Sequence, residues 1–100
     1  MVAITAASSS VGIAAIQTVN DAGGVSIAIS RKADKRAGLL AAGAHHVIAS
    51  ETEDLASRVA EITGGRGARI VFDPVAGPLL EQLANIVAAE GLIIAYGWLH

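Results

Sequence analysis

Residues 7–12 form a turn of small and hydroxyl-bearing residues between two apolar segments. The turn stands where a Gly-x-Gly-x-x-Gly fingerprint stands in a dinucleotide-binding βαβ unit, and Ala7, Ser9 and Gly12 occupy its three glycine positions. Phosphate binding there needs free backbone N–H groups at a helix N-terminus and small side chains, and a serine hydroxyl can also donate to a phosphate oxygen. The candidate pyrophosphate residues are Ala7, Ser8, Ser9, Ser10, Val11 and Gly12. An ordinary serine-capped helix start explains the same residues, so the turn alone leaves both interpretations open.

A basic cluster follows the second predicted strand. Ser30 and Arg31 end that strand, and Lys32 and Lys35 come within the next turn of the chain. An NAD-selective site usually has an Asp or Glu there, which bonds the ribose hydroxyls. A hydroxyl and several cations instead suit a 2′-phosphate, so Ser30, Arg31 and Lys35 are candidate ligands of that group. A solvated basic helix start is the alternative, but cations oppose the dipole at a helix N-terminus, which favours the functional interpretation.

Other polar residues carry weaker signals, and none is assigned a catalytic role. His45 and His46 are adjacent, and neighbouring strand residues point to opposite faces, so this pair does not readily bind one metal ion. The sequence has no cysteine, which excludes a disulfide, a thiol nucleophile and a cysteine-ligated zinc site. Glu53 and Asp54 are expected in the solvated first turn of a helix, where the helix dipole favours negative charge.

The candidate residues need a scaffold that brings distant segments together. Apolar runs predict strands, and helically spaced apolar residues predict helices between them. The expected strands are 2–6, 25–29, 46–49, 69–72 and 92–96, and the expected helices are 11–22, 33–42, 52–63 and 78–89. This alternation predicts a Rossmann-like α/β fold, a doubly wound parallel sheet of about five strands in the order 3-2-1-4-5 with helices on both faces. Its carboxyl edge would gather the serine turn, Ser30, Ser50, Val75 and Tyr96.

The length, composition and net charge limit which kinds of protein this chain can be. The 100 residues suit a single domain spanning 1–100, and 53% of them are hydrophobic but only 3% aromatic. The core is therefore expected to be aliphatic, with Leu39 and Leu40 turned inward from the second helix. The net charge of −2 gives no basic surface for nucleic acid, and no apolar run approaches the roughly 18 residues that span a bilayer. We accordingly expect a cytoplasmic protein with no nucleic-acid or membrane partner.

Four segments resemble the quinone oxidoreductase, or zeta-crystallin-like, branch of the medium-chain dehydrogenase/reductase superfamily. They are residues 6–17, 43–48, 62–68 and 71–77. The resemblance covers nearly the whole chain and implies NADP(H) as the cofactor of a Rossmann domain whose companion catalytic domain is absent. It implies hydride transfer from NADPH to a quinone or enone, without the zinc of the alcohol dehydrogenases. The 100 residues would then be a fragment with little or no turnover alone.

The resemblance also assigns roles to individual residues. It places Ser8 to Val11 at the pyrophosphate and Ser50 near the adenosine phosphate. It supports the 2′-phosphate role of Ser30, Arg31 and Lys35. The residues implied to border the nicotinamide are Val75, Tyr96 and Gly97.

Two departures from the family pattern have consequences. The double glycine of many members is Ser9-Ser10 here, and the sixth Rossmann strand is missing. The missing strand would leave the apolar, uncharged edge of 92–96 free to pair in a homodimer. A non-catalytic dinucleotide-sensing module is the alternative function. A methyltransferase-like domain fits less well, because Ser30-Arg31 supplies no acidic residue for a ribose.

Overall fold

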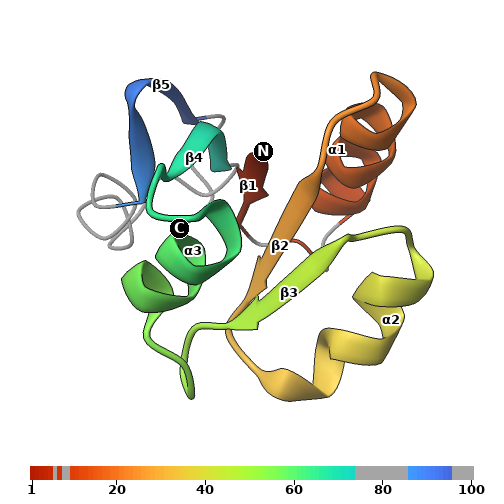
Figure 1. Cartoon of the computed structure of the whole chain (residues 1–100). Coiled ribbons are helices and arrows are strands. Elements are labelled where there is room, and N and C mark those ends of the chain that lie inside the picture. The colour runs from red at the N-terminus through yellow and green to blue at the C-terminus, as the bar shows by residue number, and fades with distance from the viewer. Residues whose placement is uncertain (6, 8–9, 74–85, 96–100) are drawn as a thin grey trace.

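The computed structural model describes residues 1–5, 7, 10–73 and 86–95. Strands and helices alternate along the chain from β1 to β4, as the apolar pattern predicts (Figure 1). The elements are β1 (Val2–Ile4), α1 (Ser10–Asp21), β2 (Ser26–Ser30), the 3-10 helix η1 (Ala33–Lys35), α2 (Arg36–Ala41), β3 (His46–Ala49), α3 (Leu55–Thr63), β4 (Ala68–Asp73) and β5 (Val87–Ala95). No helix within these described ranges is long and apolar enough to cross a membrane.

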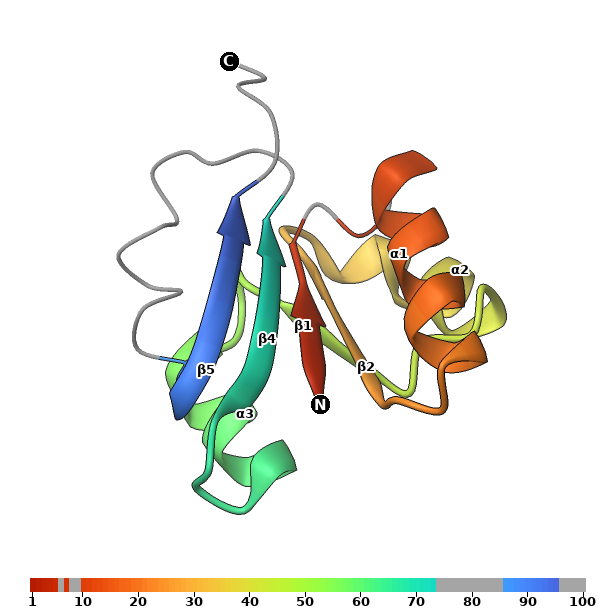
Figure 2. The ribbon, with the colours of Figure 1, turned by 90° about the horizontal axis from the view of Figure 1, so that it is seen from above.

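The five strands form one parallel sheet in the order β3-β2-β1-β4-β5, which confirms the predicted topology. β1 is central, with Val2 paired to Ser26 of β2 on one side and to Ile70 of β4 on the other. Parallel neighbours need crossover connections, and these place α1 and α2 on one face of the sheet and α3 on the other (Figure 2). The carboxyl ends of all five strands therefore lie along one edge.

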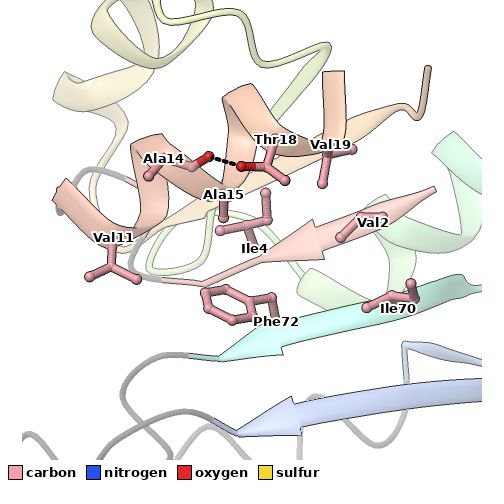
Figure 3. A pocket seen from close by; sticks show the side chains of 9 residues that line it. All are labelled: Val2, Ile4, Val11, Ala14, Ala15, Thr18, Val19, Ile70 and Phe72. Atoms are coloured by element: carbon pink, nitrogen blue, oxygen red, sulfur yellow. Dashed lines mark hydrogen bonds between the residues drawn. The ribbon is translucent and has the colours of Figure 1, made fainter. Parts of the chain in front are cut away.

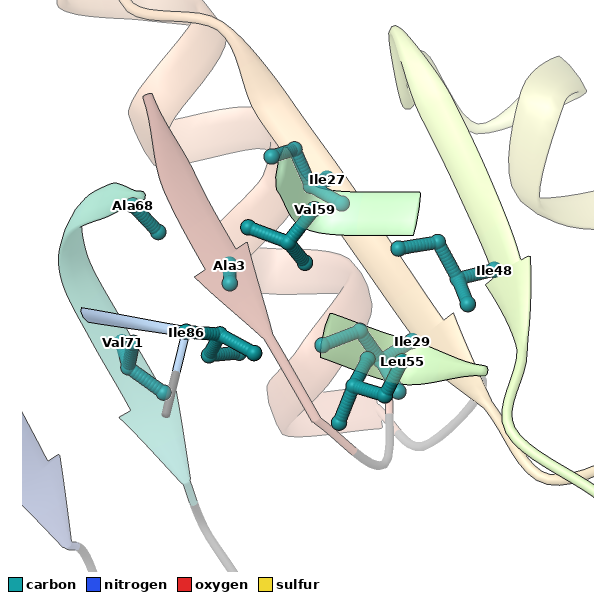
Figure 4. Packing of buried hydrophobic residues seen from close by; sticks show 9 residues of the cluster. All are labelled: Ala3, Ile27, Ile29, Ile48, Leu55, Val59, Ala68, Val71 and Ile86. Carbon is teal, nitrogen blue, oxygen red and sulfur yellow. The ribbon is translucent and has the colours of Figure 1, made fainter. Parts of the chain in front are cut away.

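Burial of both faces explains why the strands are aliphatic. Side chains alternate between the faces of a strand, so Ile27 and Ile29 pack under α3 whereas Ala28 packs under α1 and α2. The cluster on the α3 side is Ala3, Ile27, Ile29, Ile48, Leu55, Val59, Ala68, Val71 and Ile86 (Figure 4). The cluster on the opposite side is Ile4, Ala7, Ile16, Ala28, Leu39, Ala44 and Val47. Two aliphatic layers thus hold the sheet, as the composition predicts.

The last predicted helix is wrong at its C-terminal end. Helically spaced apolar residues predict a helix over 78–89, but β5 already begins at Val87. The carbonyl of Ile86 accepts a hydrogen bond from the backbone N–H of Ala68 at 2.6 Å, so this segment pairs with β4 instead of coiling. The rest of the predicted helix, 78–85, lies outside the described residues.

The early start of β5 is accommodated by an irregular pairing with β4. The register shifts between Ala68 and Ile70 of β4. Gly91 permits the close approach, because a Cβ at this position would lie 2.7 Å from the carbonyl oxygen of Arg69. The longer strand also includes Glu90, which lies outside the predicted uncharged segment 92–96.

The helices that follow β2 and β3 also differ from the prediction in detail. Segment 33–42 divides into η1 and α2, and α3 begins at Leu55 rather than at Thr52. Of the two leucines expected to face inward from α2, Leu39 is 2% exposed but Leu40 is 48% exposed. Consecutive side chains of a helix point in different directions, so Leu39 packs in the core whereas Leu40 faces solvent.

These two leucines give a matched pair of variants. We expect Leu39→Ala to lower the free energy of unfolding by about 2–3 kcal/mol, because it leaves a cavity under α2. Leu40→Ala removes the same atoms from an exposed position and should cost less than about 0.5 kcal/mol. Denaturant unfolding followed by circular dichroism measures both. Equal losses would contradict the observed rotation of α2.

Candidate functional site

Backbone hydrogen bonds join three of the predicted site segments at the carboxyl edge of the sheet. The N–H of Ala7 donates to the carbonyl of Ile29 at 3.3 Å. The N–H of Ser50 donates to the carbonyl of Ser30 at 2.8 Å, and the N–H of Glu51 donates to that of Arg31 at 3.0 Å. The ends of β1, β2 and β3 are therefore linked directly, and Ala7, Ser30, Arg31 and Ser50 lie together although they are distant in sequence.

The described part of the serine turn combines a buried small residue with the start of a helix. Ala7 is fully buried against the sheet, and α1 begins at Ser10. Gly12 is buried and Val11 is 39% exposed. The first turn of α1 contains no acidic side chain, so nothing in it repels an anion at the helix N-terminus. Ser8 and Ser9 lie outside the described residues.

The cations after β2 are available to a ligand. Arg31, Lys32 and Lys35 are exposed, and none of them forms an ion pair with any other residue in the described ranges. The Ser30 side chain is buried, and its hydroxyl donates to the carbonyl of Lys32 at 3.3 Å. That bond uses the hydroxyl proton of Ser30. The positively charged groups of this segment that are exposed to a ligand are therefore the side chains of Arg31, Lys32 and Lys35.

The next cation along the chain, Arg36, is bonded to other residues of the protein. Its Nη2 atom donates to Oε2 of Glu53 at 2.8 Å, and its Nη1 atom donates to the carbonyl of Val47 at 2.9 Å. Sequence reasoning misses this pair, because no periodicity links a residue at the start of one helix to a carboxylate 17 positions later. It also misplaces Glu53, which precedes α3 and is not a solvated residue of its first turn.

Glu53 is the most heavily bonded carboxylate among the described residues. Its Oε2 atom also accepts from the backbone N–H of Ala49 at 2.7 Å, and its Oε1 atom accepts from Nε of Arg58 at 2.9 Å. The Ala49 bond, aided by Arg58 and Arg36, holds the pKa of Glu53 below its ordinary value although partial burial opposes this. The side chain is 23% exposed, so solvent only partly screens these interactions.

The histidine pair lies at the opposite edge of the sheet, where His45 precedes β3 and His46 is its first residue. Nδ1 of His45 accepts from the backbone N–H of Ser26 at 3.1 Å, and the Ser26 hydroxyl donates to Oδ1 of Asn20 at 3.1 Å. His45 thus joins the loop before β3 to β2, a structural role. Within the described ranges, no group of three or more His, Cys, Asp or Glu side chains could hold a metal ion.

The nicotinamide side of the predicted site cannot be assembled from the described residues. Val75, Tyr96 and Gly97 lie outside them. The described part of β4 ends at Asp73, and that of β5 ends at Ala95. The roles of the three residues stay predictions.

An apolar groove of about 380 Å³ lies between α1 and the sheet (Figure 3). It is lined by Val2, Ile4, Val11, Ala14, Ala15, Thr18, Val19, Ile70 and Phe72. The hydroxyl of Thr18 donates to the carbonyl of Ala14 at 2.9 Å, and none of the described residues that line the groove is charged. The groove therefore offers no ligand for a phosphate and is separate in character from the carboxyl edge.

Residues 10–100 match the model of a family described as "Zinc-binding dehydrogenase". Quinone oxidoreductase 1 of Escherichia coli (strain K12) is 36% identical over 92 residues, which are 92% of this chain and 28% of that protein.

Two solved structures are also similar. The quinone oxidoreductase of Escherichia coli complexed with NADPH has a TM-score of 0.89 at 34% identity, over 97% of this chain and 30% of its own. An NAD-dependent alcohol dehydrogenase has a TM-score of 0.88 at 31% identity, over 97% and 29%. The chain spans less than a third of the length of these relatives.

The bonds of Glu53 predict how stability depends on pH. Because the pKa of this carboxyl is lower in the folded chain than its ordinary value of 4.5, its stabilising effect is complete above that value. The effect is lost as the pH falls through the lower, folded-state pKa. We expect Glu53→Gln to lower the free energy of unfolding at pH 7 by about 1–2 kcal/mol and to make stability less sensitive to acid.

Glu61→Gln is the matched control for this measurement. Oε1 of Glu61 accepts from Nη1 of Arg58 at 2.6 Å, but its carboxylate is 73% exposed. An exposed pair of this kind contributes about 0.5 kcal/mol or less. Urea unfolding between pH 3 and pH 7 compares the variants, and the same acid profile in all three proteins would contradict the assignment.

Proposed function

Because the chain belongs to the zinc-binding dehydrogenase family, within the medium-chain dehydrogenase/reductase superfamily, we propose that it is the NADP(H)-binding domain of a quinone or enone oxidoreductase. The observation that carries the proposal is the carboxyl edge of the sheet. There the backbone links the ends of β1, β2 and β3, and α1 begins without an acidic residue in its first turn. The three cations that follow β2 are exposed and form no ion pair with the described residues. These are the features that bind a pyrophosphate and a third phosphate group.

The serine turn supplies the pyrophosphate site. The backbone N–H groups at the start of α1 would face the anion, and the small residues of the turn would allow close approach. Gly12, buried on α1, keeps the helix close to the sheet. Ser8, Ser9 and Ser10 would add hydroxyl donors in place of the missing glycines.

Arg31 and Lys35 supply the preference for a 2′-phosphate. Both are exposed and free of ion pairs with the described residues, and the N–H of Ser50 is bonded to the carbonyl of Ser30, the residue before Arg31. Asp34 is also exposed in this segment, but no carboxylate occupies the last position of β2, where an NAD-selective site has one. The relative solved with NADPH and the similar NAD-dependent alcohol dehydrogenase make this preference a question for experiment.

The bound nicotinamide would supply the hydride, and the chain would orient it. Val75, Tyr96 and Gly97 would border its ring. We propose that transfer to a quinone or enone needs no zinc. Because the relatives are more than three times as long, we expect the 100 residues to bind cofactor but to turn over little substrate alone.

A non-catalytic dinucleotide sensor remains the second candidate. It would use the same residues at the carboxyl edge and would differ in what surrounds them. A parent gene that encodes a catalytic domain supports the reductase, whereas a neighbouring transporter or channel domain supports the sensor.

Cofactor preference tests the proposal directly. We expect the wild-type chain to bind NADPH more tightly than NADH in a calorimetric or fluorescence titration. Arg31→Asp combined with Lys35→Ala should weaken NADPH binding about 10- to 100-fold and NADH binding far less, because the lost charge-assisted bonds reach only the 2′-phosphate.

Arg66→Asp combined with Arg69→Ala is the matched control. It makes the same change in net charge, but both residues are exposed at the opposite, amino edge of the sheet, where β4 begins. It should leave the NADPH to NADH ratio unchanged. Equal or tighter wild-type binding of NADH would overturn the 2′-phosphate assignment.

We further propose that the chain forms a homodimer through β5. In the described sheet β5 pairs only with β4, so one side of its backbone is open to a second copy. Sedimentation velocity should show a dimer whose fraction rises with protein concentration. A monomer at every concentration would contradict the proposal.

A further inference from the structure

The carboxylate of Glu53 joins three segments that are separate in the sequence. Its two oxygens accept from Arg36 at the start of α2, from the backbone N–H of Ala49 at the end of β3, and from Arg58 on α3. These bonds are 2.8, 2.7 and 2.9 Å long. A charged group with three donors at these distances fixes its surroundings more firmly than a single surface ion pair does.

Arg36 extends this link along β3. Its guanidinium spans from Glu53 to the carbonyl of Val47, so the pair meets two backbone groups of an outer strand of the sheet. Covering the polar groups of an outer strand prevents a second chain from pairing there. The pair therefore holds α2 against β3.

Both ends of the link adjoin residues of the proposed cofactor site. Arg36 directly follows Lys35, and Ala49 directly precedes Ser50. Ser50 bonds to Ser30 and Glu51 bonds to Arg31 through the backbone, which closes a ring of contacts around segments 30–36 and 49–53. The two segments that would surround the 2′-phosphate are thus tied together by one carboxylate outside the site.

We propose that Glu53, acting through Arg36, is a positioning residue that sets the preference of this chain for NADPH over NADH. The inference rests on the proposed function. Long cations such as Arg31 and Lys35 lose conformational freedom when they grip a phosphate, and a backbone that is already fixed reduces this loss. NADH lacks the 2′-phosphate, so its binding does not depend on this preorganisation.

Two variants that change the net charge in opposite directions distinguish a positioning role of Glu53 from a simple effect of its charge on the phosphate. Glu53→Gln removes a negative charge and Arg36→Met removes a positive charge from the same link. If charge alone mattered, the first would strengthen NADPH binding and the second would weaken it. Positioning predicts that both weaken NADPH binding, by about 3- to 10-fold, with little effect on NADH.

Glu61→Gln is the control, because it removes a carboxylate from the same Arg58 side chain without touching Arg36 or Ala49. It should keep the wild-type ratio of NADPH to NADH affinity. The ratio is the decisive readout, since an unfolded fraction lowers both affinities by the same factor and cancels.

The outcomes distinguish this inference from the proposed function. A wild-type chain without a preference for NADPH overturns both. A wild-type preference that both Glu53→Gln and Arg36→Met retain overturns the positioning role and leaves the cofactor assignment intact. Tighter NADPH binding by Glu53→Gln would make Arg36 a direct ligand and would also overturn the positioning role.

Discussion

The structure depends on the requirement that parallel strands be buried on both faces. Each parallel connection crosses over the sheet as a helix, so aliphatic side chains must fill a layer above and a layer below it. Ile27 and Ile29 face one layer while Ala28 faces the other, and small residues such as Ala3 and Ala68 let the packing close. With both faces committed to packing, the carboxyl edge is where polar chemistry can gather.

That edge is held by backbone bonds, so its geometry does not depend on the fingerprint glycines. Ala7 is bonded to Ile29, and Ser50 to Ser30, independently of which side chains they carry. The strand ends are therefore placed by the sheet. The side chains of the serine turn and of Arg31 need only be small or charged in the right places.

The fold was largely predictable because it depends on local pattern. Alternating apolar segments indicate the strands, and their spacing requires crossovers, so the order of the five strands follows from topology rules. The end of the chain is the exception. Ile86 and Val87 continue a helical spacing, yet pairing with β4 overrides it, and sequence periodicity contains no information about that partner. The prediction that Leu40 faces the core is wrong for a related reason. Which side chains of α2 face the core depends on where η1 ends, and the apolar pattern does not contain that boundary.

The candidate site was predictable in composition but not in the division of labour among its cations. Four basic residues occur between positions 31 and 36, and their chemistry alone does not separate them. The junction of η1 and α2 does. Arg31, Lys32 and Lys35 precede it and face solvent, whereas Arg36 is the first residue of α2 and turns towards Val47 and Glu53. The cation that stabilises the fold and those offered to a ligand are thus distinguished by backbone geometry and not by residue type.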